Sequence, residues 1–184
     1  MNSFLDYKEL QELGLKSFGS NVYISRKASI YGADKIALGN HVRIDDFCIL
    51  SGNIRIGDYV HIAAYSALYG GTEGIIIEDY ANLSSRVSVY SVSDDYSGVS
   101  MTNPMVPDKY KNVESAPVYI CKHVIIGATS VVMPGTKLRE GSAFGSFSFI
   151  TKDSEEWSIY AGIPCKFIKK RERRALELED EMMV

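Results

Sequence analysis

The sequence contains few cysteines, and their positions exclude two common uses of this residue. Cys48, Cys121 and Cys165 are an odd number, and no two of them have CxxC spacing. Such a set suits neither a disulfide framework nor a cysteine-based zinc site. We therefore expect most of these cysteines to be small buried side chains, and we expect no metal cofactor.

The sequence also lacks long apolar runs and a large excess of either charge. No run approaches the roughly 18 apolar residues of a membrane span, and the first residues, MNSFLDYKEL, lack the basic and apolar regions of a secretory signal. The formal net charge of -3 disfavours nucleic acid as a partner. These absences predict a cytoplasmic protein without a membrane span, and 184 residues suit a single domain.

A six-residue repeat dominates what the sequence does contain. Aliphatic or aromatic residues recur at every sixth position over long stretches, as at Leu38, Ile44 and Leu50, and a small or β-branched residue such as Val42 follows most of them by four. This period fits neither a helix nor a simple alternating strand, but it fits short strands joined by turns around a narrow prism. The repeat predicts an all-β fold: a parallel β-helix of about six coils, with two inward positions in each hexad.

The corners, the ends and one interruption complete the predicted architecture. Pairs such as Gly39-Asn40 are expected to supply the unusual backbone angles of the corners. The repeat is interrupted between Val89 and Ile120, and a loop of this length is usually functional or disordered. We expect one domain over residues 1–184, with a short helical cap over 1–17 that begins at a capping box Ser3-Phe4-Leu5-Asp6, the β-helix over 18–154, a long loop over about 91–117, and an extension with a charged helix over 155–184.

Several segments of the repeat, IGDYVHI, VIIGATSVVMPGTKL and EGSAFGSFSFITKD, resemble the hexapeptide-repeat acyltransferases. The segment YAGIPCKFIKKR is similar to the closing segment of the galactoside and maltose acetyltransferase branch of that family. The resemblance extends from about residue 18 to residue 171. It implies a left-handed β-helix, a homotrimer, acetyl-CoA as the acyl donor, and a sugar O- or N-acetyltransferase of surface-polysaccharide synthesis.

The same resemblance implies where coenzyme A binds. The backbone at Gly127, Ala128, Gly145 and Ser146 would line the pantetheine arm. Residues near the nucleotide end would be Thr151, Lys152, Ile163, Pro164 and Lys166. Lys169, Lys170 or Arg171 would pair with a phosphate group, for which a side-chain cation is the natural partner.

The start of the loop differs from the family at its catalytic position. Relatives carry a histidine there, whereas the aligned stretch VYSVSDDYSG has Asp94, followed by Asp95. A carboxylate with an ordinary pKa of about 3.9 is a weak base for a sugar hydroxyl, but an amine loses its proton far more readily. We therefore predict N-acetylation of a nucleotide-linked amino sugar, with Asp94 or Asp95 attracting the incoming ammonium and relaying its proton.

Three alternatives stay open at this point. The two aspartates could simply shape a tight turn, in which case His61 or His123, facing the cleft between subunits, is the next candidate base. The protein could instead O-acetylate a sugar hydroxyl or serine, or it could be a non-catalytic or metal-binding assembly protein, although no HxxxxH pair indicates a zinc site.

Tyrosines are dense around the interruption of the repeat, and sugar rings and bases dock well on tyrosine rings. The residues predicted to bind the acceptor substrate are Asn82, Tyr90, Ser93 and Tyr96.

Overall fold

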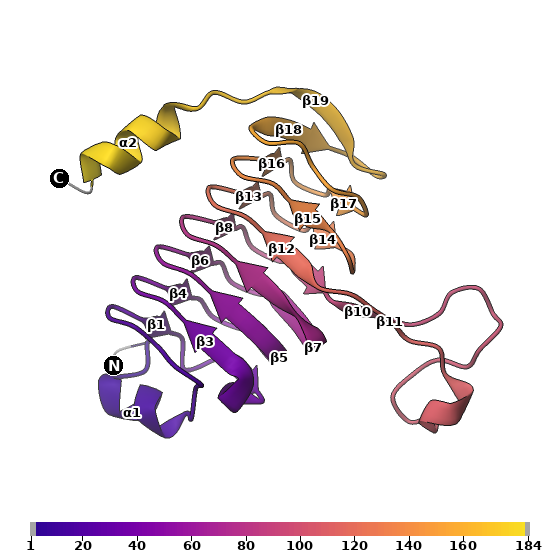
Figure 1. Cartoon of the computed structure of the whole chain (residues 1–184). Helices are drawn as coiled ribbons and strands as arrows, with labels where there is room; N and C mark the ends of the chain where they lie inside the picture. Colours follow the sequence, from indigo (N-terminus) through magenta and orange to yellow (C-terminus); the bar gives the residue numbers. More distant parts are fainter. Residues whose placement is uncertain (1–2, 183–184) are drawn as a thin grey trace.

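The hexads form a prism of short stacked strands (Figure 1). The structure is a computed structural model, and it describes residues 3–182. Each strand of the prism pairs in parallel with the equivalent strands of neighbouring coils, and seven such strands follow one another along one sheet. The protein is therefore a parallel β-solenoid of about seven turns. This is one turn more than the hexads indicated, because β18 (Ser158–Ala161) continues the stack after the last hexad and past residue 154.

The prism has three walls, which we number in the order in which the chain crosses them. Wall 1 is the long sheet of β1 (Tyr23–Ile24), β4 (Arg43–Ile44), β6 (His61–Ile62), β8 (Asn82–Leu83), β13 (Ile125–Ile126), β16 (Ala143–Phe144) and β18. Wall 2 contains β2 (Ser29–Tyr31), β9 (Ser88–Tyr90), β14 (Val131–Val132), β17 (Phe149–Ile150) and the first halves of β5 (Ile49–Ile56) and β7 (Ala67–Ile77). Wall 3 contains the second halves of β5 and β7 with β3 (Ile36–Leu38), β12 (Val118–Ile120) and β15 (Lys137–Leu138).

The core lies along the axis of the prism. Large aliphatic side chains such as Ile44, Leu50 and Ile56 are almost fully buried, and smaller residues such as Val42 and Cys48 fill the space near the corners. The two inward positions that the hexads predict are therefore confirmed. Each buried side chain of this size contributes about 1.5–3 kcal/mol through removal of apolar area from water, so the stacked hexads account for the main stabilisation of the fold.

The corner between walls 3 and 1 relies on side-chain stacking more than on glycine. Between walls 3 and 1, the residues that adopt positive φ include His41 and Tyr59, one position after the Gly-Asn and Gly-Asp pairs. The expectation that those pairs hold the unusual backbone angles is therefore wrong. A left-handed conformation costs about 1–2 kcal/mol per residue, and it is offset here by ring stacking along the corner. The stacked column is His41, Tyr59, Tyr80 and His123, with Trp157 tilted against His123.

A short helix, α1 (Tyr7–Glu12), covers the first coil, as predicted. Its capping box differs from the expected one. The side chain of Asp6 accepts a hydrogen bond from the backbone N–H of Glu9, and the Glu9 carboxylate accepts one from the N–H of Asp6. Ser3 is therefore not the N-cap. Leu10 is buried against the core, and Glu9 also pairs with Arg26 of the first coil, so the helix is fixed to the prism on two sides.

The opposite end carries an antiparallel strand and a second helix (Figure 1). After β18 the chain turns back as β19 (Lys166–Lys170), which pairs antiparallel with β18. The predicted C-terminal helix is α2 (Arg174–Met182), and it lies along the corner of the prism that carries His123.

The long insertion leaves the prism at the corner between walls 2 and 3 and projects away from it (Figure 1). Its base is a small antiparallel ladder of β10 (Val92–Ser93) and β11 (Glu114–Ser115). Its outer part contains the 3-10 helix η2 (Asp108–Tyr110), whereas a second 3-10 helix, η1 (Ala33–Lys35), lies in the first coil. The ladder fixes where the insertion starts, and so it fixes the position of Asp94.

Candidate active site

The base of the insertion and the outer face of wall 2 enclose a cavity of about 1120 Å³. Tyr69 and Tyr90 form one side of it, and their rings stack with centroids 5.0 Å apart. The cavity is lined by Ser51, Tyr69, Tyr90, Val92, Ser93, Asp94, Tyr96, Pro104, Val113, Val131, Met133 and Phe149. Most of this surface is apolar, and Asp94 is the one ionisable carboxylate in the lining. A mostly apolar cavity with few polar groups is the usual form of a small-molecule site.

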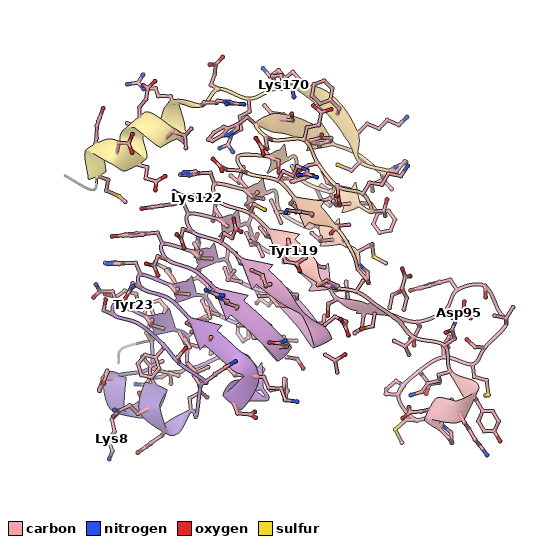
Figure 2. All side chains as sticks on the ribbon, viewed as in Figure 1. Lys8, Tyr23, Asp95, Tyr119, Lys122 and Lys170 are labelled. Atoms are coloured by element: carbon pink, nitrogen blue, oxygen red, sulfur yellow. The ribbon has the colours of Figure 1, made fainter. Side chains whose placement is uncertain are left out.

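The structure gives the two adjacent aspartates different surroundings. The carboxylate of Asp95 accepts hydrogen bonds from the backbone N–H of Ser97 at 2.8 Å and from the hydroxyl of Ser100 at 2.7 Å. These bonds to Ser97 and Ser100 hold the pKa of Asp95 below its ordinary value. Asp95 therefore shapes the turn inside the insertion (Figure 2), whereas Asp94 is exposed at the cavity.

Three of the four predicted acceptor-binding residues line this cavity together with Asp94. They are Tyr90, Ser93 and Tyr96. Ser93 also donates a hydrogen bond to the backbone carbonyl of Asp94 at 3.2 Å, which helps to orient the start of the insertion. Asn82 lies elsewhere, in β8 on wall 1.

Wall 1 carries a column of small residues on its outer face. Backbone hydrogen bonds between successive turns place Ala63, Ser84, Gly127 and Gly145 one above another, and Ala161 follows Tyr160 at the next turn. A Cβ atom on Gly127 would come within 2.7 Å of the backbone of Gly145, so the chain needs glycine at this position to keep the turns in contact. We call this column, which has no long side chain from Ala63 to Ala161, the wall 1 trough.

The predicted cofactor residues fall into two groups. Gly127 and Gly145 belong to the wall 1 trough, and Ala128 and Ser146 follow them at the corner between walls 1 and 2. A second cavity of about 300 Å³ lies at the C-terminal end of the prism. It brings together four other predicted residues, Thr151, Lys152, Pro164 and Lys166, beside the ring of Tyr160.

The remaining predicted cofactor residues lie outside this second cavity. Ile163 is 74% exposed, and Lys169 is an exposed residue of β19. The guanidinium of Arg171 donates to the backbone carbonyls of His123 and Gly141 at 3.0 and 2.9 Å, and burial lowers its pKa. Arg171 anchors the start of the C-terminal segment to the prism, which argues against its predicted role as a phosphate ligand.

The two histidines that were candidate bases have carboxylate partners in different places. His61 lies within β6 on wall 1, and its Nε2 atom is 2.8 Å from Asp45 Oδ2. His123 is buried at the corner under α2, and its Nε2 atom is 2.8 Å from Glu179 Oε2. The neighbouring Lys122 and the insertion lie on opposite sides of the prism (Figure 2), so the structure does not bring His123 to Asp94.

Asp45 is held from two sides. Arg43 Nε donates to its Oδ1 atom at 2.7 Å, while His61 binds its Oδ2 atom. Burial opposes ionisation of Asp45, but the hydrogen bonds from His61 and Arg43 outweigh burial and lower its pKa below the ordinary value. Arg43, Asp45 and His61 therefore form a fixed polar cluster on wall 1.

Within residues 3–182, no group of three or more His, Cys, Asp or Glu side chains is arranged to hold a metal ion. The same residues include no helix that is both long and apolar enough to cross a membrane.

Comparison with known proteins agrees with the fold. A parallel β-solenoid with an insertion at this corner and a closing segment near a glycine trough defines a hexapeptide-repeat acyltransferase, and the chain belongs to that family. It is 51% identical over 180 residues to the dTDP-4-amino-4,6-dideoxy-D-glucose acyltransferase of Escherichia coli, which covers 96% of this chain and 93% of that protein. No family model matches the chain.

Two further comparisons extend this result. The chain is 29% identical to the putative lipopolysaccharide biosynthesis O-acetyl transferase WbbJ of Escherichia coli K12, over 80% of this chain and 75% of that protein. It matches the crystal structure of AntD, an N-acyltransferase from Bacillus cereus in complex with dTDP and 3-hydroxybutyryl-CoA, with a TM-score of 0.98 and 51% identity over 100% of this chain and 97% of that chain.

AntD has also been solved with single substitutions, among them D94A, D94N and S84A. This chain has aspartate and serine at the same two numbers. Asp94 was among the residues predicted from the sequence, but Ser84 was not. Its position could have been found from the hexads, because Ser84 follows inward-facing Leu83 and lies one turn before Gly127 in the wall 1 trough.

Proposed function

We propose that this protein transfers an acyl group, most simply acetyl, from a coenzyme A thioester to the amine of a dTDP-linked 4-amino-4,6-dideoxy sugar. The observation that carries this proposal is the position of Asp94, a carboxylate at the mouth of a tyrosine-lined cavity, and AntD also has aspartate at this number. The 51% identity to a dTDP-4-amino-4,6-dideoxy-D-glucose acyltransferase supports the same acceptor.

The chemistry of Asp94 favours an amine over a hydroxyl. A carboxylate attracts the ammonium form of an amino sugar and lowers the cost of bringing it to the thioester. The attacking form is the free amine, and it arises far more readily than an alkoxide. O-acetylation, to which the likeness to WbbJ points, would need a stronger base at the position of Asp94.

The cofactor would lie along the wall 1 trough. The absence of side chains at Gly127 and Gly145 allows a pantetheine arm to approach the backbone, and Lys152 and Lys166 at the C-terminal cavity supply cations for the phosphates. With this orientation the thioester points along the trough toward Ser84.

A second copy of the chain is needed to complete this site. Ser84 faces outward from wall 1, whereas Asp94 lies at the far edge of wall 2, and the corner at Arg86 and the strand β9 separate them. Wall 2 of one protomer, placed against wall 1 of its neighbour, would bring Asp94 to Ser84. We therefore propose a homotrimer in which each site lies between two protomers.

We also propose a cytoplasmic location and a role in surface-polysaccharide synthesis. The three cysteines are free, as is usual in a reducing compartment. The likeness to a lipopolysaccharide O-acetyl transferase supports the biosynthetic role.

The test is an acceptor comparison with purified protein. The protein is incubated with acetyl-CoA and either dTDP-4-amino-4,6-dideoxyglucose or the matching sugar nucleotide that carries a hydroxyl at the same carbon. Free thiol and product mass are measured. We expect thiol release and one added acetyl group with the amino sugar alone. Acetylation of the hydroxyl compound alone, or no transfer to either, would overturn the proposal. A parallel assay with 3-hydroxybutyryl-CoA identifies the preferred acyl chain.

A further inference from the structure

His61 and Asp45 form a hydrogen-bonded pair beside the proposed end of the cofactor trough. The Nε2 atom of His61 lies 2.8 Å from Oδ2 of Asp45, and Arg43 holds the other carboxylate oxygen at 2.7 Å. The side chain of Asp45 is 18% exposed, whereas that of His61 is 42% exposed. Asp45 is therefore the fixed and more buried residue of the pair, and His61 is the accessible one.

This hydrogen bond selects one tautomer of neutral His61. An ionised carboxylate accepts hydrogen bonds and donates none, so the imidazole must carry its proton on Nε2 to bind Asp45. The Nδ1 atom then has a lone pair, and the described residues offer no hydrogen-bond partner for it. A histidine whose orientation and tautomer are set by a carboxylate is the arrangement that general bases require.

The pair lies close to the point where the thioester would end. His61 is the direct neighbour of Asn82 in the parallel sheet, and Ser84 lies two residues after Asn82. Ala63 lies between Asp45 and Ser84 in the stack of turns, and its side chain is a single methyl group. Adjacent strands are about 4.8 Å apart, so His61 lies one strand away from Asn82, and Ser84 is one strand and two residues away from it.

We propose that His61 is the proton acceptor of the acyl transfer and that Asp45 is its positioning residue. This inference rests on the proposed function. Asp94 of a neighbouring protomer attracts the substrate ammonium, and His61 Nδ1 takes one proton from it. The free amine then attacks the thioester carbonyl carbon, a C–N bond forms and the C–S bond breaks. The second proton leaves the nitrogen and ends on the departing thiolate, and imidazolium His61 returns its proton to solvent.

Chemical rescue tests the role of His61. In His61→Ala we expect kcat to fall about 100-fold, with unchanged affinity for coenzyme A, and added imidazole should restore part of the lost turnover. His61→Asn is the second variant, because its amide can still donate to Asp45 and keep the wall intact without providing a base. It should lose kcat to the same extent. The control is His41→Ala at the corner, where the ring stacks on Tyr59, and it should turn over normally.

Asp45→Asn tests the positioning residue. The Asn amide can accept from Nε2–H of one tautomer or donate to the unprotonated Nε2 of the other, so it no longer selects a tautomer, and it does not stabilise imidazolium. The kcat should therefore fall about 10-fold or more with little change in the KM of either substrate. The acid limb of the pH profile of kcat/KM should lie at lower pH in Asp45→Asn than in the wild type. A purely structural role for Asp45 would lower stability and leave the profile unmoved.

The possible outcomes separate this inference from the proposed function. Wild-type protein that transfers no acyl group to the amino sugar contradicts the proposed function itself. The inference alone is contradicted if the wild-type protein is active and the folded His61→Ala and His61→Asn variants keep their turnover. It is also contradicted if added imidazole does not raise the turnover of His61→Ala. Loss of kcat with imidazole rescue supports both.

Discussion

Asp94 and Asp95 are neighbours in the chain, but only Asp94 opens onto the tyrosine-lined cavity. Both carboxylate oxygens of Asp95 are occupied by Ser97 and Ser100 within the insertion. The structure thus separates two residues that the sequence could only treat as a pair, and it supports Asp94 as the substrate-facing carboxylate.

The first prediction concerns this difference. Asp94→Asn should lower kcat/KM for the amino sugar about 100-fold, because it removes the charge that attracts the ammonium, and it should leave the affinity for coenzyme A unchanged. Asp95→Asn is the matched control, because its amide oxygen still accepts from the Ser97 N–H, and it should keep most of the turnover. Steady-state rates and calorimetric titration with coenzyme A measure both effects. A larger loss in Asp95→Asn than in Asp94→Asn would contradict the assignment.

The second prediction concerns the wall 1 trough. Gly127→Ala places a methyl group within 2.7 Å of the Gly145 backbone, whereas Gly145→Ala meets the Ala161 methyl at 3.1 Å. Backbone yields less readily than a side chain. We therefore expect Gly127→Ala to lower both the melting temperature and coenzyme A affinity more than Gly145→Ala does. Equal losses for the two variants in thermal melts and binding assays would contradict this ranking.

The third prediction concerns the attachment of α2. Glu179 binds Lys122 at 2.5 Å and His123 at 2.8 Å, and these partners hold its pKa below the ordinary value. Because the folded-state pKa is the lower one, the ion pair contributes fully above the ordinary glutamate pKa of about 4.3 and is lost as the pH falls through the folded value. We expect α2 to detach in that acidic range.

Trp157 provides the measurement for this prediction. It is the one tryptophan of the chain, it is buried beside His123, and the guanidinium groups of Arg171 and Arg173 lie over its ring. Glu179→Gln should give, near neutral pH, the Trp157 emission change that wild type shows only in acid. Asp180→Asn, on the exposed side of α2, should behave as wild type. Identical acid titrations of wild type and Glu179→Gln would rule out the ion pair as the attachment.

The fourth prediction concerns the core. Leu83 is fully buried in the middle of wall 1, and Leu83→Ala should lower the free energy of unfolding by about 3 kcal/mol through lost transfer energy and a residual cavity. The matched control is Leu178→Ala, because this leucine of α2 is 50% exposed. Denaturant titration of the two variants compares them directly. An equally small loss of unfolding free energy in both variants would mean that neighbouring side chains move into the space left by the Leu83 side chain.

The parts of the structure that could be predicted from the sequence are those with a strict period. Ile44, Leu50 and Ile56 are buried because the hexad repeats the same local geometry at every turn. This prediction depends only on counting residues along the chain. Asp94 could be found because the stretch VYSVSD resembles the family stretch that carries a histidine, and Asp94 stands at the histidine position.

Contacts between elements with no common period could not be predicted. His123 and Glu179 are 56 residues apart and meet only because α2 folds back along a corner. The pair of Asp45 and His61 lies diagonally across two strands, and its geometry depends on side-chain rotamers that the hexad does not specify. Arg171 resembled a phosphate ligand in the sequence, but its guanidinium is bound to backbone carbonyls.

The reversal of chain direction at β19 has a consequence for how the protein behaves at high concentration. A stack of parallel strands offers unpaired N–H and C=O groups at its last turn, and a second molecule could extend the stack there without limit. The hairpin of β18 and β19 occupies that edge with five exposed residues, three of them lysines, and at the first turn the bridge between Phe4 and Ser25 does the same. The column is closed at both ends by its own chain, which prevents growth into fibres while the side walls stay free to assemble.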